Sequence, residues 1–339
     1  MTLTVLVTDS AWPSLDVERA AFAKIGAELI VATEGSEDEL VSLAGLADAI
    51  LTCWAPVTAR VLDAATRCRT VARYGVGLDN IDVEHASKLG IVVTNVPDYC
   101  VDEVSDHALA LILTLARHIV AFAGQTAAGG WDNTQFGPMR RVRAQTLGLI
   151  GYGNIARRLG DKAAALGMRV LTHSRSGATS VAAESDSVTF APTLEALLAE
   201  SDFVSVHVPL TDQTTGLIGS AELAAMKPTG YLINTSRGAV VDTDALAHAL
   251  RERVIAGAAL DVLPVEPPAP DDPLPELDNL ILTPHAAFDS VESIEELQRK
   301  AARNVVDVLS GNRPKYLINA DAYGTEPFAL RATQMAVSR

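Results

Sequence analysis

The stretch Thr146-Leu147-Gly148-Leu149-Ile150-Gly151-Tyr152-Gly153-Asn154-Ile155-Ala156 decides the fold class. An apolar strand runs directly into the turn Gly151-x-Gly153-x-x-Ala156, and a helix is predicted to open at Asn154. A dinucleotide pyrophosphate needs this geometry: the first glycine makes the turn, the second lets backbone approach the phosphates, and a small third residue lets helix pack on strand. The helix N-terminus offers unpaired N–H groups to the anion. The stretch therefore predicts a dinucleotide site at Gly151, Gly153, Asn154 and Ile155.

Length and charge limit what surrounds this turn. A chain of 339 residues is too long for one core and is expected to form about two domains. The formal charge of −15, from 27 basic and 42 acidic residues, argues against nucleic acid or an anionic membrane as a general partner. It leaves small anionic ligands open, because local arginines and helix ends decide those.

The cysteines and the apolar segments predict the compartment. Cys53, Cys68 and Cys100 have no metal-ligand spacing, so we expect reduced thiols, no metal site and a cytoplasmic protein. Residues 1–7 enter a strand with no basic region ahead of them, so no signal peptide is expected. The longest apolar helical candidate, 108–116, is far shorter than the roughly 20 residues that span a bilayer.

Two series of short apolar strands alternate with helical patterns. The first series is predicted at 4–8, 27–31, 49–52, 70–73 and 91–94, and the second at 147–150, 169–172, 203–206, 231–234, 257–261 and 279–282. One long helix is expected over 101–123, capped by Asp102, and another over 290–309, stopped by Gly311 and Pro314. Residues 320–339 have no strong pattern.

This alternation predicts an α/β protein with two Rossmann-like domains, each built on a parallel sheet. The dinucleotide-binding domain, 100–288, is expected to be inserted into a discontinuous substrate domain made of 1–99 and 289–339.

Three second-series strands are followed by a polar residue that can act on a substrate: Arg237, Glu266 and His285. Ligands of open α/β sheets bind beyond the carboxyl ends of the strands. Any one of the three alone is better interpreted as a surface cation, a solvated acid or a capping histidine. Together they supply what hydride transfer to a 2-oxo acid requires: a guanidinium for the carboxylate, an imidazole as proton donor and a carboxylate that holds the imidazole.

The remaining histidines suit this chemistry less well. His85, His107, His118 and His248 are expected on helices, where a solvated face is the simpler interpretation. His207 is expected to be structural rather than catalytic.

The chain closely resembles the D-isomer-specific 2-hydroxyacid dehydrogenases from about Ala49 to Asn319. The motifs that carry the resemblance are 73–82 (RYGVGLDNID), the glycine turn, 234–238 (NTSRG), 261–262 (DV) and 283–285 (TPH). The resemblance implies that Arg237 binds the substrate carboxylate, that His285 is the acid/base and that Glu266 is its partner. It also implies backbone contacts to the substrate from Gly75, Val76 and Gly77. Asp261 would hold the nicotinamide amide, with Thr235, His207 and Pro209 lining the cofactor.

The end of the strand predicted at 169–172 bears on the choice of cofactor. NAD-specific sheets carry an acid here for the ribose hydroxyls, whereas this chain has Ser174-Arg175 and no acid between Arg169 and Ala183. Serine and arginine can bind a 2′-phosphate. NADP is therefore favoured over NAD, although Arg175 stacking on adenine would allow NAD.

Three functions stay open from the sequence. The segment 95–107 is most similar to the C-terminal-binding-protein subgroup, some of whose members are nucleotide-sensing binding modules, but Phe288 stands where that subgroup usually has Trp. Phosphoglycerate dehydrogenases carry an Arg at the turn where this chain has 53–56 (CWAP), without a cation. The preferred prediction is an NAD(P)-dependent oxidoreductase that interconverts a small 2-oxo acid of the glyoxylate/hydroxypyruvate type and a D-2-hydroxy acid.

Trp131 stands in a Gly-rich segment between a long helix and the dinucleotide fold. It can fold onto its own domain, but the resembled family forms two-fold dimers in which this loop reaches the neighbouring subunit. The resemblance therefore implies a homodimer with Trp131 at the contact.

Overall fold

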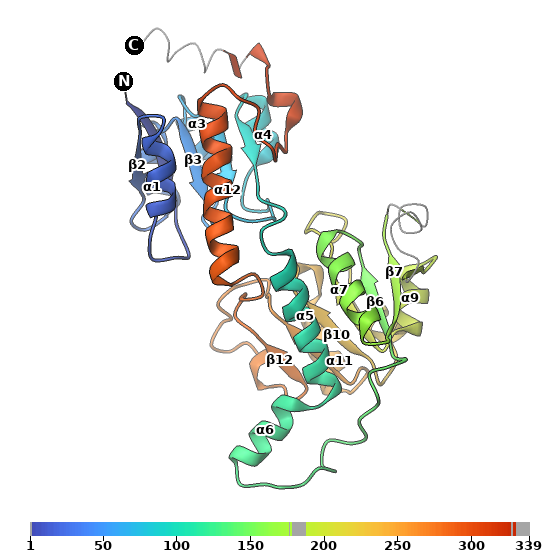
Figure 1. Ribbon diagram of the computed structural model, residues 1–339. Helices are drawn as coiled ribbons and strands as arrows, with labels where there is room; N and C mark the ends of the chain where they lie inside the picture. The colour runs from blue at the N-terminus through green and yellow to red at the C-terminus, as the bar shows by residue number, and fades with distance from the viewer. Residues whose placement is uncertain (1, 176, 178–187, 327, 330–339) are drawn as a thin grey trace. The chain divides into compact units, whose positions relative to one another are not determined.

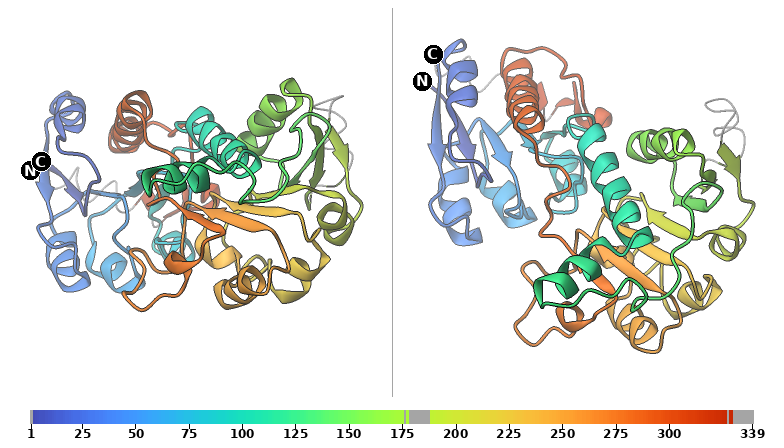
Figure 2. Two further views of the ribbon diagram at one scale, coloured as in Figure 1. Left: turned by 90° about the horizontal axis from the view of Figure 1, so that it is seen from below. Right: turned by 60° about the horizontal axis from the view of Figure 1, so that its bottom comes forward.

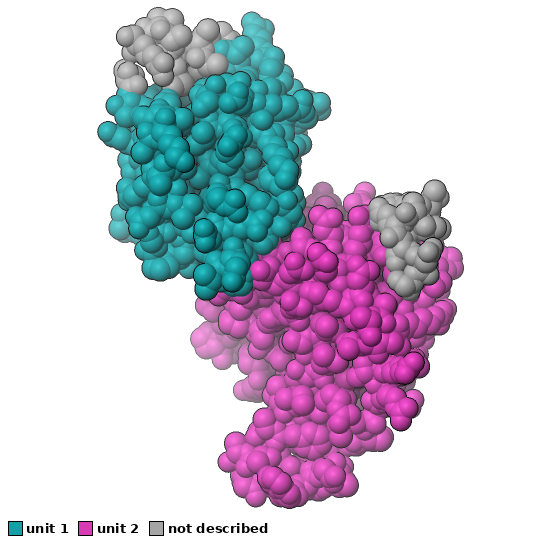
Figure 3. All heavy atoms as spheres, in the orientation of Figure 1, with its two compact units in different colours: residues 1–99, 290–339 teal, residues 100–289 magenta. Residues whose placement is uncertain are grey.

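The computed structural model describes residues 2–175, 177, 188–326 and 328–329. The chain divides into two compact units (Figure 3). Unit 1 comprises Met1–Tyr99 and Ser290–Arg339, and unit 2 comprises Cys100–Asp289. Each unit has its own sheet and its own buried core, so the two are described separately.

Unit 1 is a five-stranded parallel sheet in the order β2-β1-β3-β4-β5 (Figure 1). Its strands are β1 (Leu3–Val7), β2 (Ala27–Val31), β3 (Ala49–Thr52), β4 (Thr70–Arg73) and β5 (Val92–Thr94). One face is covered by α1 (Asp16–Ala23) and α12 (Val291–Leu309), and the other by α2 (Glu37–Ala44), α3 (Ala59–Ala64) and α4 (Val83–Lys88) (Figure 2). Every residue of β3 and β4 is buried, as expected for strands covered on both faces.

Unit 2 is a seven-stranded parallel sheet in the order β12-β11-β10-β9-β6-β7-β8. The strands are β6 (Thr146–Ile150), β7 (Arg169–His173), β8 (Val188–Phe190), β9 (Phe203–Val206), β10 (Tyr231–Asn234), β11 (Gly257–Leu260) and β12 (Leu280–Leu282). The order reverses between β6 and β9, and ligands of such sheets bind beyond the strand ends at that point. The predicted α/β class with two Rossmann-like parallel sheets is confirmed.

The helices of unit 2 lie on both faces of this sheet (Figure 2). The first face is covered by α5 (Val101–Ala116) and α7 (Asn154–Ala165), and the second by α9 (Leu194–Glu200), α10 (Ser220–Ala225) and α11 (Thr243–Arg251). Short 3₁₀ turns occur at η1 (Gly238–Val240) and η2 (Leu274–Glu276) in this unit, and at η3 (Ala320–Ala322) in unit 1.

Three sequence predictions about the elements of unit 2 were wrong. The helix predicted over 101–123 is broken, because His118 has a left-handed backbone (φ 51°) between α5 and α6 (Ile119–Ala127). Asp102 does not cap α5: it lies inside the first turn, and its carboxylate pairs with Arg158 of α7 at 2.9 Å. The strand β8 was missed because three partly exposed residues carry no clear pattern.

Among the described residues, no single helix is both long enough and apolar enough to cross a membrane. Taken together, α5 and α6 pass a test of length and hydropathy, but they are bent by 62° at their break.

The predicted helix 290–309 is present as α12. Ser290 caps it, because the Ser290 Oγ accepts from the Ser293 N–H at 2.9 Å and the Ser293 Oγ accepts from the Ser290 N–H at 2.9 Å. Of the patternless segment 320–339, residues 327 and 330–339 lie outside the described residues.

Candidate active site

The glycine turn after β6 touches the end of β9. Gly151 has φ 92°, and a Cβ at this residue would lie 2.5 Å from the carbonyl oxygen of His207. Both observations require glycine, since a side chain would be strained and would collide with backbone. The turn and the 207–209 segment therefore meet at the point where the strand order reverses.

Several features at the carboxyl ends of β6 and β9 fit a bound dinucleotide. A Cβ at Gly153 would meet nothing within 4 Å, so the backbone there is open to a ligand. Gly153 is also the N-cap of α7 and supplies no side-chain cap, which leaves the helix N-terminus suited to a phosphate. Asn154 and Ile155 begin α7. The buried Thr235 Oγ1 has no hydrogen-bond partner within the part of the chain that the structure describes.

The other predicted cofactor residues also follow the carboxyl ends of strands in this sheet. His207 Nε2 lies 2.8 Å from Ser205 Oγ, and burial lowers the pKa of His207 to about 4, so this imidazole is neutral. The carbonyl of Pro209 accepts from the Thr214 hydroxyl at 2.6 Å. Ser174 and Arg175 follow β7, and Arg175 Nη1 donates to Gln213 Oε1 at 2.7 Å.

The loop that carries His285 is organised by Asp261, which is buried at the end of β11. The Asp261 carboxylate accepts from the backbone N–H of Ala286 at 3.0 Å and of Ala287 at 2.9 Å, and the Asp261 carbonyl accepts from the His285 N–H at 2.8 Å. His285 itself has a left-handed backbone, with φ 53°. A non-glycine residue in that region is strained, so the surrounding hydrogen bonds must hold it.

His285 and Glu266 form a direct pair. His285 Nδ1 lies 2.7 Å from Glu266 Oε2, and Glu266 Oε1 accepts from the Leu263 N–H at 2.8 Å. Burial alone would raise the pKa of Glu266. The hydrogen bonds from His285 and Leu263, with the charges of His285 and Arg237, instead hold that pKa below its usual value. Glu266 is therefore a carboxylate at neutral pH.

The loop of Arg237 is pressed against the loop of Glu266. A Cβ at Gly238 would lie 2.0 Å from the carbonyl carbon of Leu263, so only glycine permits this approach. Arg237 Nη1 donates to the carbonyl of Ser236 at 2.8 Å. Arg237, Glu266 and His285, which follow three different strands, are thus gathered into one cluster on unit 2.

Gly75, Val76 and Gly77 belong to unit 1 and are described within that unit only. Their loop follows β4, and it is fixed through its carbonyls: Gly75 accepts from the Val96 N–H at 2.9 Å, and Val76 accepts from Asn95 Nδ2 at 2.8 Å. Both carbonyls are therefore engaged within unit 1.

Sequence interpretation was wrong about His107. It was expected on a solvated helix face, but its Nε2 lies 3.0 Å from Thr283 Oγ1 and 3.6 Å from Asp261 Oδ1. No local pattern could have found this contact, because 176 residues separate His107 from Thr283. His85 instead pairs with the exposed Asp63 at 2.7 Å, and His248 is exposed, as expected.

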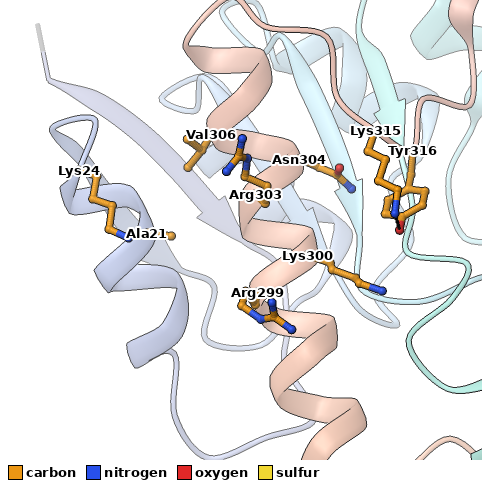
Figure 4. Close-up of a pocket in the computed structure, with 9 residues that line it drawn as sticks. All are labelled: Ala21, Lys24, Arg299, Lys300, Arg303, Asn304, Val306, Lys315 and Tyr316. Atoms are coloured by element: carbon orange, nitrogen blue, oxygen red, sulfur yellow. Dashed lines mark hydrogen bonds between the residues drawn. The ribbon is translucent and has the colours of Figure 1, made fainter.

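A hollow of about 380 Å³ on unit 1 is separate from the predicted residues (Figure 4). It lies between α1, α12 and residues 315–316, and α12 contributes Arg299, Lys300 and Arg303. Lys300 pairs with Asp98 at 2.6 Å, and Arg303 pairs with Asp307 at 2.8 Å. None of the residues predicted to bind substrate or cofactor lines this hollow. We therefore take the cluster of Arg237, Glu266 and His285 on unit 2 as the candidate active site. Among the described residues, no group of three His, Cys, Asp or Glu side chains is arranged to hold a metal ion.

Known proteins resemble both the sequence and the fold. A model of the NAD-binding domain of D-isomer-specific 2-hydroxyacid dehydrogenases matches residues 109–287. A glyoxylate reductase of Korarchaeum cryptofilum is 42% identical over 276 residues, which is 80% of this chain and 82% of that protein.

Two solved structures have the same architecture. The NADPH-dependent glyoxylate/hydroxypyruvate reductase of Sinorhizobium meliloti, in complex with NADP and malonate, is 28% identical with a TM-score of 0.81, over 95% of this chain and 98% of that one. The D-lactate dehydrogenase of Aquifex aeolicus, in complex with NAD and lactic acid, is 29% identical with a TM-score of 0.81, over 91% of this chain and 96% of that one.

Proposed function

This chain belongs to the D-isomer-specific 2-hydroxyacid dehydrogenase family and is an NAD(P)-dependent oxidoreductase; on that premise we propose that it interconverts a small 2-oxo acid of the glyoxylate/hydroxypyruvate type and the corresponding D-2-hydroxy acid. The observation that carries the proposal is the 2.7 Å contact between His285 Nδ1 and Glu266 Oε2, beside the charge of Arg237. Relatives named glyoxylate reductase support the substrate class.

The roles of the three residues follow from their chemistry. When bound, a reduced nicotinamide would supply the hydride that the carbonyl carbon of the 2-oxo acid accepts. Arg237 binds the substrate carboxylate through its guanidinium. His285 gives a proton to the carbonyl oxygen, and in the reverse direction its neutral imidazole takes the hydroxyl proton. Because Nδ1 is engaged by Glu266, this transfer uses Nε2, and the Glu266 carboxylate holds the imidazole ring in place.

Residues on both units would hold the ligands. We propose that Gly151, Gly153 and the start of α7 bind the pyrophosphate, that Thr235, His207 and Pro209 line the cofactor, and that Asp261 holds the nicotinamide amide. On unit 1, the N–H groups of Gly75, Val76 and Gly77 would bind the substrate carboxylate.

A kinetic screen tests the function. Glyoxylate, hydroxypyruvate, phosphohydroxypyruvate and pyruvate would be assayed with NADH and NADPH in wild type, His285→Ala, Arg237→Ala and the exposed control His248→Ala. We expect His285→Ala to lose most turnover with cofactor affinity retained, and Arg237→Ala mainly to raise KM. Full activity in His285→Ala would refute the assignment. Preference for phosphohydroxypyruvate would indicate a phosphoglycerate dehydrogenase, and tight dinucleotide binding without any reduction would indicate a nucleotide-sensing module.

We propose NADP as the preferred cofactor. Ser174 and Arg175 follow β7 where an acid for the ribose would stand, and Gln213 holds the Arg175 guanidinium at 2.7 Å. Arg175→Ala should weaken NADPH binding more than NADH binding, because only NADPH carries the 2′-phosphate. Fluorescence titration of both cofactors, with Arg251→Ala as control, measures this. Equal losses for the two cofactors would contradict the proposal.

We also propose a homodimer. No residue of α6 is buried, Ile119 and Val120 are 55% and 56% exposed, and Trp131 is 91% exposed. α6 extends beyond the sheet of unit 2 (Figure 1), and large apolar side chains on such a projection favour association. Sedimentation at micromolar concentration should give a dimer that Trp131→Ala weakens and Leu46→Ala, on unit 1, does not. A fully active wild-type monomer would rule out the dimer.

A cytoplasmic location is proposed from the thiols. Cys53, Cys68 and Cys100 are all buried and form no disulfide bond with one another, and cysteines without disulfides are typical of reducing compartments. Detection of the protein only outside the cytoplasm after cell fractionation would contradict this.

A further inference from the structure

His107 touches the residues that shape the loop of His285. It lies on α5, and its side chain is one-quarter exposed. Its Nε2 is 3.0 Å from Thr283 Oγ1, and the Thr283 hydroxyl is 2.5 Å from Asp261 Oδ1. These three side chains form a chain of polar contacts from α5 to the ends of β11 and β12.

The direction of each hydrogen bond follows from counting protons. A threonine hydroxyl has one proton to donate, and a carboxylate can only accept. The 2.5 Å contact therefore uses the Thr283 proton, so Thr283 Oγ1 must accept from His107. The Nε2 of His107 consequently carries a proton, and His107 is the donor at the head of the chain.

This series of hydrogen bonds, which begins at His107, ends at the backbone beside His285. The Asp261 carboxylate that accepts from Thr283 also accepts from the N–H groups of Ala286 and Ala287, at 3.0 and 2.9 Å. His285, directly before them, has the left-handed φ of 53°. A strained residue keeps such a conformation only when its surroundings determine it. The Asp261 carboxylate, which Thr283 holds in place, fixes this conformation through its hydrogen bonds to Ala286 and Ala287.

We propose that His107 is a positioning residue, whose Nε2–H orients Thr283 and Asp261 and thereby holds the 285–287 backbone in the conformation that presents the His285 imidazole. The inference rests on the proposed function, in which His285 transfers the proton. His107 does not touch the reacting atoms in this role. Its removal therefore affects turnover more than substrate binding.

Two variants at His107 separate the effect of the lost hydrogen bond from the effect of a changed side-chain shape. His107→Phe keeps a ring and removes the donor, whereas His107→Gln keeps an N–H at a similar reach. We expect kcat for 2-oxo acid reduction to fall about 3-fold to 10-fold in His107→Phe, the range that corresponds to one hydrogen bond between uncharged groups. The KM for the oxo acid should change about threefold or less, and His107→Gln should recover most of the turnover. The exposed control His248→Phe should match wild type.

Thr283→Val tests whether Thr283 connects His107 to Asp261 through its hydroxyl. Valine has the shape of threonine without its hydroxyl, so it should give the same defect as His107→Phe. The double variant should be no worse than either single one, because both break the same chain. Fully additive losses would overturn this connection.

Amide hydrogen exchange of the ligand-free protein gives a readout that needs neither substrate nor cofactor. The amides of Ala286 and Ala287 should exchange faster in His107→Phe than in wild type or His248→Phe, and His107→Gln should restore their protection. Unchanged exchange and turnover in His107→Phe, or an equal defect in His107→Gln, would overturn the proposal. If the wild type reduces no 2-oxo acid, the proposed function fails, while the exchange experiment still decides the role of His107.

Discussion

Replacement of Gly238 by alanine tests whether the contact between two loops sets the geometry of the candidate site. Gly238 follows Arg237, and Leu263 belongs to the loop of Glu266. The added methyl would lie 2.0 Å from the Leu263 carbonyl carbon, 2.3 Å from the Pro264 nitrogen and 2.4 Å from the Leu263 oxygen. All three are backbone atoms, so no flexible side chain can move aside.

The displacement follows from these distances. Carbon atoms reach their optimal separation at about 3.5–4.0 Å, so the two loops must part by roughly 1.5 Å beside Arg237 and Glu266. A misplacement of about 1 Å lowers the rate of an enzyme by about 100-fold. We therefore expect kcat/KM for 2-oxo acid reduction to fall about 100-fold, which corresponds to about 2.7 kcal/mol of transition-state stabilisation.

Steady-state kinetics and thermal unfolding measure the effect. The matched control is Gly45→Ala in unit 1, where the new Cβ would lie 3.6 Å from the Ala64 oxygen, an ordinary contact. The Tm of Gly238→Ala should fall by a few degrees, as expected for overpacking that costs about 1–3 kcal/mol. A Gly238→Ala protein with kcat/KM within twofold of wild type would refute the reasoning, because the two loops would then tolerate separation.

Three other changes have distinct expected outcomes. Glu266→Gln should lower kcat/KM for reduction about 10-fold to 100-fold, the value of a hydrogen bond to a charged group, because the carboxylate that holds the His285 imidazole is gone; the exposed Glu252→Gln should leave the rate unchanged. Gly153→Ala should leave the Tm of the ligand-free protein unchanged, because its Cβ meets nothing within 4 Å, but should weaken dinucleotide binding at least about tenfold in a fluorescence titration; unchanged affinity would contradict the phosphate assignment. Burial raises the pKa of Glu18 above 4.5 despite its hydrogen bond from Tyr74, so its contribution to stability is present below pH 4.5 and is lost as pH rises through the raised value. Urea unfolding should accordingly find Glu18→Gln gaining stability relative to wild type as the pH rises from 4.5 through the raised pKa, and a difference that stays constant with pH would contradict this.

The local pattern of the chain determined the fold class. Parallel strands buried on both faces are short apolar runs, and most strands lie within one residue of the predicted ranges. The glycine turn was recognisable because strand, turn and helix are adjacent in sequence. Arg237, Glu266 and His285 could be nominated because each follows a strand, and the carboxyl ends of parallel strands share one edge of a sheet.

Tertiary structure decided the contacts between segments that are distant in sequence. The end of α5 depends on the left-handed backbone of His118. The place of Asp102 depends on its ion pair with Arg158 of α7, which the sequence around Asp102 does not reveal. The approach of Gly238 to Leu263 depends on how two loops pack, and the contact of His107 with Thr283 depends on which strand ends lie beneath α5. Strand order and packing set such distances, and neither has a periodicity that a linear sequence can express.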